Sequence, residues 1–373
     1  MNKRIWLSSP HMGTMERKFV DEAFDTNWIS PLGPNLDGFE KDLEIFLGEN
    51  VHVAALQSGT AALHLALLLL NVKQGDEVLC QSMTFAASAN PITYAGATPV
   101  FVDSERETWN ISPALLEKAI LERKKKGKLP KALILVHLYG MPANLKEILE
   151  ITQKHEIALI EDAAESLGST YQGRNTGTFG DISVLSFNGN KIITTSGGGA
   201  LVSKNPDYAS RARFLSTQAR DSAVHYEHSV IGYNYRLSNI CAGIGRGQMT
   251  VLKERVQQRR KVFNYYLQAL NGLHDIEFLH EPGPDYFSNR WLTTILLKNY
   301  ETREKIREQL ALVNIESRPL WKPMHLQRVF NGAPAYVNGV SEDLFTRGLC
   351  LPSGSNLEES DLEGVVRQLK SAF

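Results

Sequence analysis

The chain has 373 residues, 43% of them hydrophobic and 22% charged, which is the composition of an ordinary globular protein. Its 40 basic and 41 acidic residues leave a formal net charge of -1, so the charge gives no support for binding to nucleic acid or to an anionic membrane. The longest apolar run, residues 65–70, is far too short to cross a bilayer, and the N-terminus lacks the apolar stretch of a signal peptide. Cys80, Cys241 and Cys350 are isolated and lack metal-binding spacing, which favours a reducing compartment and predicts a cytoplasmic protein.

Residues 51 to about 203 alternate between short apolar runs and helical patterns. The strand-like runs cover residues 51–56, 77–80, 98–103, 132–138, 157–160 and 182–185, and the helical patterns cover residues 60–70, 86–94 and 144–155. Continuous apolar strands separated by helices are typical of a mainly parallel sheet with helices on both faces. We therefore predict an α/β fold.

The pattern changes after Ser238. One long helix is expected from about residue 240 to 270, followed by a shorter region of mixed strands and helices. This predicts a large domain of residues 1–245, and a linking helix with a smaller domain in residues 246–373. The most basic run, residues 123–128, follows an amphipathic stretch and indicates a solvated helix end and surface loop.

A Gln-Ser-Gly-Thr segment, residues 57–60, stands between a predicted strand and a predicted apolar helix. Small and polar residues at a helix N-terminus leave backbone N–H groups free, and the helix dipole favours an anion there. We therefore expect Gly59 and Thr60 to bind a phosphate group. An ordinary helix cap would need the same residue types, so the segment alone is a weak signal.

An acid and a lysine follow two of the predicted strands. Asp162 ends one strand at the edge of the sheet where open α/β folds bind ligands, and Lys191 lies in a polar, glycine-framed loop after another strand. A lysine that forms a Schiff base, with an acid that keeps a pyridine nitrogen protonated, suits pyridoxal 5′-phosphate. Ser186 could donate a hydrogen bond to the cofactor phosphate. The alternatives are a helix N-cap for Asp162 and an ordinary exposed lysine, which the glycine-rich setting disfavours.

Two further features give weaker signals. Phe85 follows a predicted strand and could stack on a flat ring, although a phenylalanine of the core fits the sequence nearly as well. His225 and His228 have a spacing that could suit a metal, but no further ligands accompany them. We predict no metal site.

Four segments together resemble the DegT/DnrJ/EryC1/StrS family of nucleotide-sugar aminotransferases, namely residues 57–63, 161–164, 186–191 and 232–236. The resemblance runs essentially from end to end. It implies the aspartate-aminotransferase-like fold of fold type I pyridoxal phosphate enzymes. In that fold a large domain has a mainly parallel central sheet between helices, and a smaller C-terminal α/β domain follows.

The resemblance also implies a role for each matching residue. Lys191 looks like the Schiff-base lysine, Asp162 like the partner of the pyridine nitrogen, and Phe85 like the aromatic residue that stacks on the ring. The residues that match the phosphate binders are Gly59, Thr60 and Ser186. Asn234 matches an asparagine that reaches the phosphate of the neighbouring subunit's cofactor, which implies an obligate homodimer.

A closer resemblance is to the UDP-4-amino-sugar enzymes of bacillosamine synthesis, carried by residues 10–13, 27–33, 191–199, 216–220, 225–228 and 318–325. In such enzymes two of these segments line the sugar-nucleotide site. The residues that would contact the substrate are Asn27, Trp28, Ile29, Ser30, Arg318, Pro319, Leu320, Trp321 and His325. The guanidinium of Arg318 suits a phosphate or carboxylate, and the two tryptophans offer flat apolar faces, with core packing as their alternative. Glu165 stands where many relatives have glutamine, although glutamate also occurs in this group.

The reaction that the resemblance implies is transfer of an amino group from L-glutamate to C4 of a UDP-linked 2-acetamido-2,6-dideoxy-4-keto-hexose. Lysine at position 191, where the related sugar 3-dehydrases have histidine, favours amine transfer over deoxygenation. The open alternatives are a GDP- or dTDP-linked ketosugar, the pseudaminic or legionaminic branch, and a non-catalytic sensor on the same fold.

Overall fold

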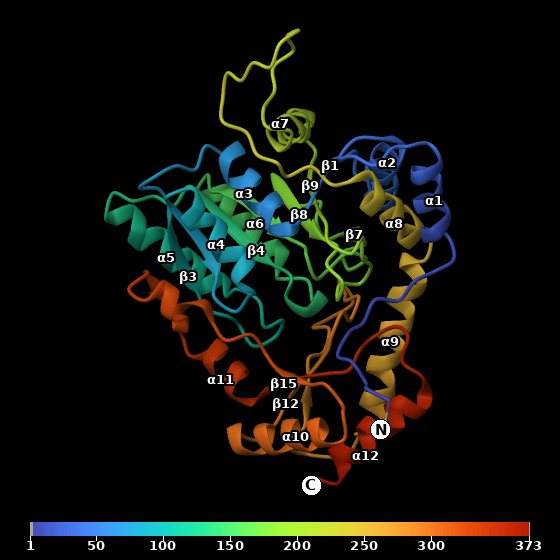
Figure 1. The fold of residues 1–373 in the computed structure, drawn as a ribbon. Coiled ribbons are helices and arrows are strands. Elements are labelled where there is room, and N and C mark those ends of the chain that lie inside the picture. Colours follow the sequence, from blue (N-terminus) through green and yellow to red (C-terminus); the bar gives the residue numbers. More distant parts are fainter. Residues whose placement is uncertain (1–2, 373) are drawn as a thin grey trace.

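A computed structural model describes residues 3–372 of the chain (Figure 1). Its centre is an eight-stranded sheet with the strand order β1-β9-β8-β5-β4-β2-β3-β14. The strands are β1 (His52–Leu56), β9 (Gly199–Ser203), β8 (Ile182–Ser186), β5 (Ala158–Asp162), β4 (Ala132–Val136), β2 (Glu77–Gln81), β3 (Thr98–Val102) and β14 (Ala335–Tyr336). All neighbours from β8 to β14 are parallel, and only β9 runs against the strands beside it. The predicted mainly parallel sheet is confirmed.

Helices cover both faces of this sheet. They are α3 (Gly59–Leu69), α4 (Ala86–Tyr94), α5 (Pro113–Lys125), α6 (Leu145–Lys154), α7 (Pro206–Ser216), α1 (Glu16–Asp25), α2 (Pro34–Leu47) and α8 (Asn239–Met249). Successive strand residues belong to different cores, as β4 shows: Ile134 packs in the core with α3 and α4, whereas Leu133 and Leu135 pack in the core with α5 and α6. Because both faces are buried, the strands are apolar throughout, which is why the sequence revealed them.

The helix predicted for residues 240–270 is in fact two helices. α8 ends at Met249 and α9 (Leu252–Ala269) begins after a turn in which the Thr250 hydroxyl donates to the Gly247 carbonyl at 2.6 Å. The glycines of α8 let it pack closely on α1 and α2, since a Cβ at Gly245 would lie 2.7 Å from the Phe39 ring. α9 then leads away toward the smaller sheet (Figure 1). The helical pattern was right, but its continuity was wrong.

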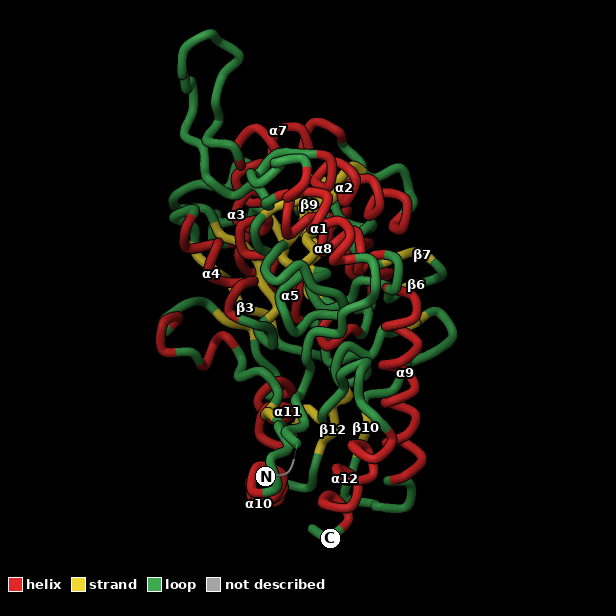
Figure 2. The backbone as a smooth tube through the Cα atoms, turned by 45° about the vertical axis from the view of Figure 1, so that its right-hand side comes forward, coloured by secondary structure: helices red, strands yellow, loops and turns green. Residues whose placement is uncertain are grey.

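A second sheet of four antiparallel strands lies at the other end of the molecule, with the order β10-β12-β15-β13 (Figure 2). Its strands are β10 (Glu277–Phe278), β12 (Thr293–Leu296), β15 (Gly348–Leu351) and β13 (Arg318–Pro319), and its helices are α10 (Tyr300–Leu312), α11 (Val340–Arg347) and α12 (Glu359–Lys370). A third sheet joins β6 (Thr170–Tyr171), β7 (Arg174–Asn175) and β11 (Tyr286–Phe287).

The chain passes between the two larger sheets more than once. After β13 it returns to the large sheet, where β14 pairs with β3 and the Phe330 ring packs 5.2 Å from that of Phe101. Ile5, near the other end of the chain, forms a bridge with Ile315. The predicted boundary between residues 245 and 246 falls within α8. The division into two domains stays a prediction.

The sequence predicted that the basic run at residues 123–128 is solvated, and the structure confirms this only in part. Its lysines are exposed, but Arg123 is buried in the last turn of α5. Arg123 binds both carboxylate oxygens of Glu77, with 2.7 Å between Nε and Oε2. Glu77 is itself a buried residue at the start of β2, so the arginine is buried because it neutralises a buried acid.

No helix within residues 3–372 is both long enough and apolar enough to cross a membrane.

Candidate active site

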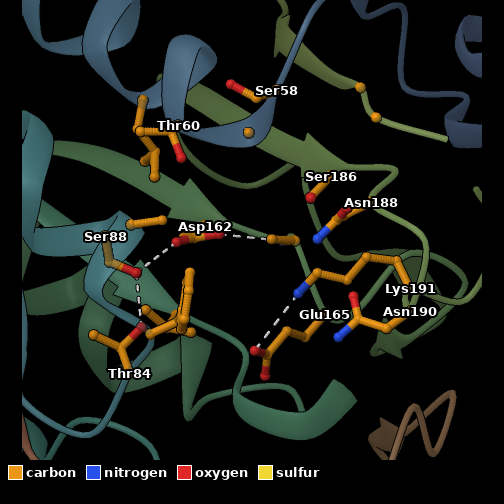
Figure 3. A pocket seen from close by; sticks show the side chains of 18 of the residues that line it. Ser58, Thr60, Thr84, Ser88, Asp162, Glu165, Ser186, Asn188, Asn190 and Lys191 are labelled. Carbon is orange, nitrogen blue, oxygen red and sulfur yellow. Dashed lines mark hydrogen bonds and ion pairs between the residues drawn. The ribbon is translucent and has the colours of Figure 1, made fainter. Parts of the chain in front are cut away.

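A cavity of about 320 Å³ lies at the carboxyl ends of the parallel strands (Figure 3). Asp162 and Ser186, the last residues of β5 and β8, line it, and Phe85 reaches it from the segment after β2. Open α/β sheets bind ligands at this edge because the strands end there and the following segments diverge. Three of the residues predicted to hold a cofactor thus come from the ends of parallel strands that meet at one place.

The N-terminus of α3 forms one wall of the cavity. Ser58 caps the helix by accepting a hydrogen bond from the Ala61 N–H at 3.0 Å, while the N–H groups of Gly59 and Thr60, in the first turn, have no partner within the helix. Gly59 packs closely on Ser186, since a Cβ at this glycine would lie 3.2 Å from the serine Cβ. A bulkier residue would therefore narrow the space between the helix start and the serine hydroxyl. The arrangement fits an oxyanion such as a phosphate.

Asp162 is buried on the opposite side of the cavity from the lysine-bearing loop. Its carboxylate accepts hydrogen bonds from the Ser88 hydroxyl at 2.7 Å and the Ala164 N–H at 3.2 Å. The Thr84 hydroxyl lies 2.7 Å from that of Ser88, so a short polar chain supports the acid (Figure 3). Burial raises the pKa of Asp162, against the lowering by Ser88, Ala164 and the charge of Lys191. A protonated ring nitrogen beside this acid would offset the cost of its burial.

The neighbouring Glu161 has a different task, because successive strand residues face opposite sides of the sheet. Its buried carboxylate accepts hydrogen bonds from His137 Nε2 at 2.8 Å and from the backbone N–H groups of Gly177, Phe179 and Gly180. Burial would raise the pKa of Glu161, but these donors hold it below the usual value. Glu161 therefore fixes the segment behind the cavity.

Lys191 projects into the cavity from a tightly wound loop (Figure 3). Its side chain is 13% exposed, and Nζ lies 3.7 Å from Oε1 of Glu165 and 4.2 Å from the centre of the Trp291 ring. Two backbone hydrogen bonds close the loop on Phe187, one from its N–H to the Gly198 carbonyl and one to its carbonyl from the Thr195 N–H. These bonds fix the backbone of the loop, from which the amino group points toward Glu165 rather than into solvent.

A buried arginine donates hydrogen bonds to backbone carbonyls of this loop and of the Trp291 segment. Arg259 of α9 donates to the carbonyls of Trp291 and Lys191, the latter at 3.4 Å, and to the Ser8 hydroxyl at 2.9 Å. The Trp291 indole N–H in turn donates to the Asn190 carbonyl at 2.7 Å. Segments from both ends of the chain therefore fix the backbone on either side of the lysine.

Aromatic rings form the open side of the cavity. Phe85 is 55% exposed, although it lines the cavity, and its ring lies 5.4 Å from that of Trp321. A phenylalanine of the core would be buried, so this exposed ring at the cavity suits contact with a flat ring. Together with the anion-binding helix start, the buried acid and the lysine, it provides the contacts that pyridoxal 5′-phosphate needs.

The profile of the DegT/DnrJ/EryC1/StrS aminotransferase family matches residues 10–370 of this chain. The chain is 52% identical, over 100% of its length and 97% of the other protein, to the "Putative pyridoxal phosphate-dependent aminotransferase EpsN" of Bacillus subtilis (strain 168). It is 38% identical to the GDP-perosamine synthase of Escherichia coli O157:H7, with 96% of each chain covered. Among solved structures, the PLP-form of the "Putative sugar aminotransferase Spr1654" from Streptococcus pneumoniae matches with a TM-score of 0.92 at 26% identity, over 99% of this chain and 98% of that one.

The chain belongs to the DegT/DnrJ/EryC1/StrS aminotransferase family. The resemblance read from the four sequence segments is confirmed, and so is the fold that it implied. Pyridoxal 5′-phosphate is the cofactor of this aminotransferase, as the lysine and the acid predicted.

The predicted cofactor residues of the aminotransferase lie together, with one exception. Those that line the cavity are Gly59, Thr60, Phe85, Asp162, Ser186 and Lys191. Asn234 lies apart from them and is exposed, held by a bridge to Thr217. Its predicted contact with a neighbouring subunit's cofactor stays a prediction, as do the individual roles of the other residues.

The predicted substrate residues of the aminotransferase are more dispersed. Trp321 lines the cofactor cavity and also a second cavity of about 440 Å³, which Arg318, Pro319 and Leu320 line as well. His325 lies outside both and bonds to the Ser82 hydroxyl at 2.6 Å. The segment Asn27, Trp28, Ile29 and Ser30 lies before α2, outside the linings of both cavities.

Sequence reasoning missed several residues of this site. Ser88 supports Asp162 but looks like any small residue of α4, and the only available signal was its spacing of one helical turn from Thr84. Trp291 contacts Lys191 from a distant part of the chain, and no local pattern links the two. Among residues 3–372, no group of three or more His, Cys, Asp or Glu side chains is placed to hold a metal ion.

Proposed function

We propose that this aminotransferase moves an amino group from L-glutamate to C4 of a UDP-linked 2-acetamido-2,6-dideoxy-4-keto-hexose, giving a UDP-4-amino sugar and 2-oxoglutarate. The observation that carries the proposal is the convergence of Lys191, Asp162 and the start of α3 on one cavity. The same residues argue against a sensor that has kept only the fold, because such a protein would have no need of the lysine.

Different residues of the cavity would hold the cofactor and transfer the proton. When bound, pyridoxal phosphate supplies an aldehyde that exchanges amino groups and a ring that withdraws electrons from the bond being broken. Gly59, Thr60 and Ser186 would hold its phosphate, and Asp162 would keep its ring nitrogen protonated. Lys191 would take the Cα proton of the donor on Nζ and deliver a proton back to the substrate. The hydrogen bonds that close its loop fix the backbone from which Nζ enters the cavity.

The sugar half of the proposal rests on the resemblance to bacillosamine-type enzymes and on the aromatic walls. Trp321 and Trp291 line both the cofactor cavity and the second cavity beside it, and Arg318 lines the second one. Flat apolar rings suit a sugar face, and a guanidinium suits a diphosphate. The 38% identity to a GDP-perosamine synthase supports a second candidate, a GDP-linked 4-ketosugar as the acceptor.

We also propose that the enzyme works as a homodimer in the cytoplasm. The segment of residues 220–231 projects from the body of the molecule (Figures 1 and 2), with Val224, Tyr226 and Ile231 exposed on it. Exposed apolar side chains on a projecting segment suit contact with a second copy, and the exposed Asn234 follows directly. Cys80, Cys241 and Cys350 are free, which agrees with a reducing compartment.

Two experiments test the proposal. Borohydride reduction of the yellow holoenzyme should fix the cofactor covalently to Lys191, and Lys191→Ala should show no such adduct; an undiminished adduct in the variant would refute the role of this lysine. The purified enzyme should then be given glutamate and a panel of UDP-, GDP- and dTDP-linked 4-ketosugars. We expect an amino product from the UDP-linked acetamido sugar, identified by mass, with its C4 configuration read by NMR. Turnover of the GDP-linked sugar alone would favour the second candidate.

A further inference from the structure

A second buried acid, Glu165, shares the cavity with Lys191, and nothing in the reaction outlined above uses it. Its Oε1 lies 3.7 Å from Lys191 Nζ, and both residues line the same cavity (Figure 3). We infer that Glu165 is a positioning residue: its carboxylate holds the Lys191 amino group in place whenever that group is free of the cofactor, and it stabilises the ammonium form each time Nζ takes up a proton. The inference rests on the proposed role of Lys191.

The two oxygens of Glu165 have different partners. Oε2 accepts a hydrogen bond from the Tyr139 N–H at 2.7 Å, which fixes the carboxylate, and Oε1 is left to face Lys191. Tyr139 sits in the left-handed region with a φ of 53°, so a bulky residue is held in an uncommon conformation where its N–H points at this acid. The backbone thus presents Oε1 to the lysine before any ligand arrives.

Glu165 is buried among other ionisable groups, which determine how easily it carries a charge. The ionisable groups that face it are Lys191, Asp162, Cys350 and the Tyr139 hydroxyl, with the Trp321 indole as a further neighbour. Burial raises the pKa of Glu165, and the nearby charge of Asp162 acts in the same direction, while Lys191 and the Tyr139 N–H oppose them. Among the described residues, Lys191 is the cation that forms an ion pair with Glu165.

In this position, the carboxylate of Glu165 stabilises the protonated form of the Lys191 amino group. Each time Nζ takes up a proton it becomes a cation, and a carboxylate 3.7 Å away stabilises that form in a site screened from water. Removal of the negative charge takes this stabilisation away. Glutamine at this position can accept the Tyr139 N–H with its oxygen, but its amide NH₂ then faces the lysine, so donor meets donor when Nζ is protonated. Glu165→Gln therefore removes the contact with Lys191 while leaving the backbone contact in place.

The first test uses enzyme from which the cofactor has been removed. The rate at which an acylating reagent modifies Lys191 is measured against pH, with the modified peptide identified by mass spectrometry. In Glu165→Gln we expect the half-maximal rate about one pH unit lower than in the wild type, which is about a tenfold faster modification at a fixed pH on the rising limb. Glu165→Asp keeps the charge and should stay close to the wild type.

The second test uses the holoenzyme. The half-reaction with glutamate is followed by loss of cofactor absorbance, and its acid limb should move in the same direction in Glu165→Gln. Glu281→Gln is the control, because Glu281 also accepts one backbone N–H, from Ser288 at 2.7 Å, and pairs with cations, Arg260 and Arg290, but lies outside the cavity. It should leave both profiles unchanged.

The outcomes separate the two proposals. Unchanged profiles in Glu165→Gln, or an equal shift in Glu281→Gln, would overturn the inference. So would a Glu165→Asp variant that behaves like the glutamine variant. Absence of a borohydride adduct at Lys191 in the wild type would instead refute the proposed function, whereas the reagent test on cofactor-free enzyme would still report the contact between Glu165 and Lys191.

Discussion

Replacement of Ser88 by alanine should move the pH dependence of the enzyme without disturbing its fold. The Ser88 hydroxyl donates to the Asp162 carboxylate at 2.7 Å, and this bond opposes the rise that burial causes in the pKa of Asp162. A hydrogen bond to a charged group contributes about 1.5–3 kcal/mol. Since about 1.36 kcal/mol corresponds to a factor of ten, the loss of this bond should disfavour the ionised form of Asp162 by about ten- to a hundredfold and so raise its pKa further.

The sign of the effect follows from the form of Asp162 that the reaction needs. In the proposed role the ionised carboxylate would hold the protonated ring nitrogen, and an acid with a higher pKa ionises only at higher pH. The acid limb of cofactor binding and of the half-reaction with glutamate should therefore shift upward in Ser88→Ala by about one to two pH units. Titration of cofactor absorbance at a series of pH values measures both. A threonine at position 88 keeps the hydroxyl and should preserve most of the wild-type profile.

A second alanine variant on the same helix controls for general effects of substitution. Thr93 of α4 is exposed and its hydroxyl donates only to the Asn90 carbonyl, at 2.7 Å, so Thr93→Ala should leave the acid limb in place. An unshifted limb in Ser88→Ala, in enzyme that binds the cofactor normally at high pH, would refute the claim that Ser88 keeps Asp162 ionised.

Two further predictions concern stability. Arg123→Met should lower the free energy of unfolding by about 3 kcal/mol, which is at the low end for a broken buried ion pair because Lys128 Nζ remains 3.7 Å from Glu77. Denaturant unfolding should show this loss, and cofactor affinity should be unchanged. Asp162→Asn should raise the thermal midpoint of the cofactor-free enzyme at pH 7. Burial raises the pKa of Asp162, so its ionised form destabilises the folded state at pH values above the raised pKa, and the neutral amide removes this cost. The same variant should lose turnover, and a lower midpoint would contradict the argument.

The parts of the fold that the sequence revealed are those whose pattern is local. β1, β2, β3, β4, β5 and β8 are buried on both faces, so each appears as an apolar run bounded by turn residues. β9 escaped notice because it begins with the last of three glycines, and β14 because it has two residues and exists only through its pairing with β3. Such strands are defined by their partners, which no local pattern records.

The same distinction holds for the active site. Asp162 and Lys191 were found because each follows a recognisable strand and the parallel topology brings strand ends together. Trp291, Ser88 and the contact of Glu165 with Lys191 depend on side chains that meet only after folding. The substrate segments before α2 and around β13 were inferred from resemblance alone, and of those nine residues only Trp321 lines the cofactor cavity.

The electrostatics of the cavity explain why these contacts belong together. Two buried acids, Asp162 and Glu165, face a single lysine, and burial raises the pKa of both. An acid in this state is stabilised in its ionised form by whatever cation approaches it. In the proposed reaction that cation is the protonated ring nitrogen for Asp162, and for Glu165 it would be the ammonium group that Lys191 forms when it takes up a proton. Each acid would therefore have a different cationic partner in the same cavity.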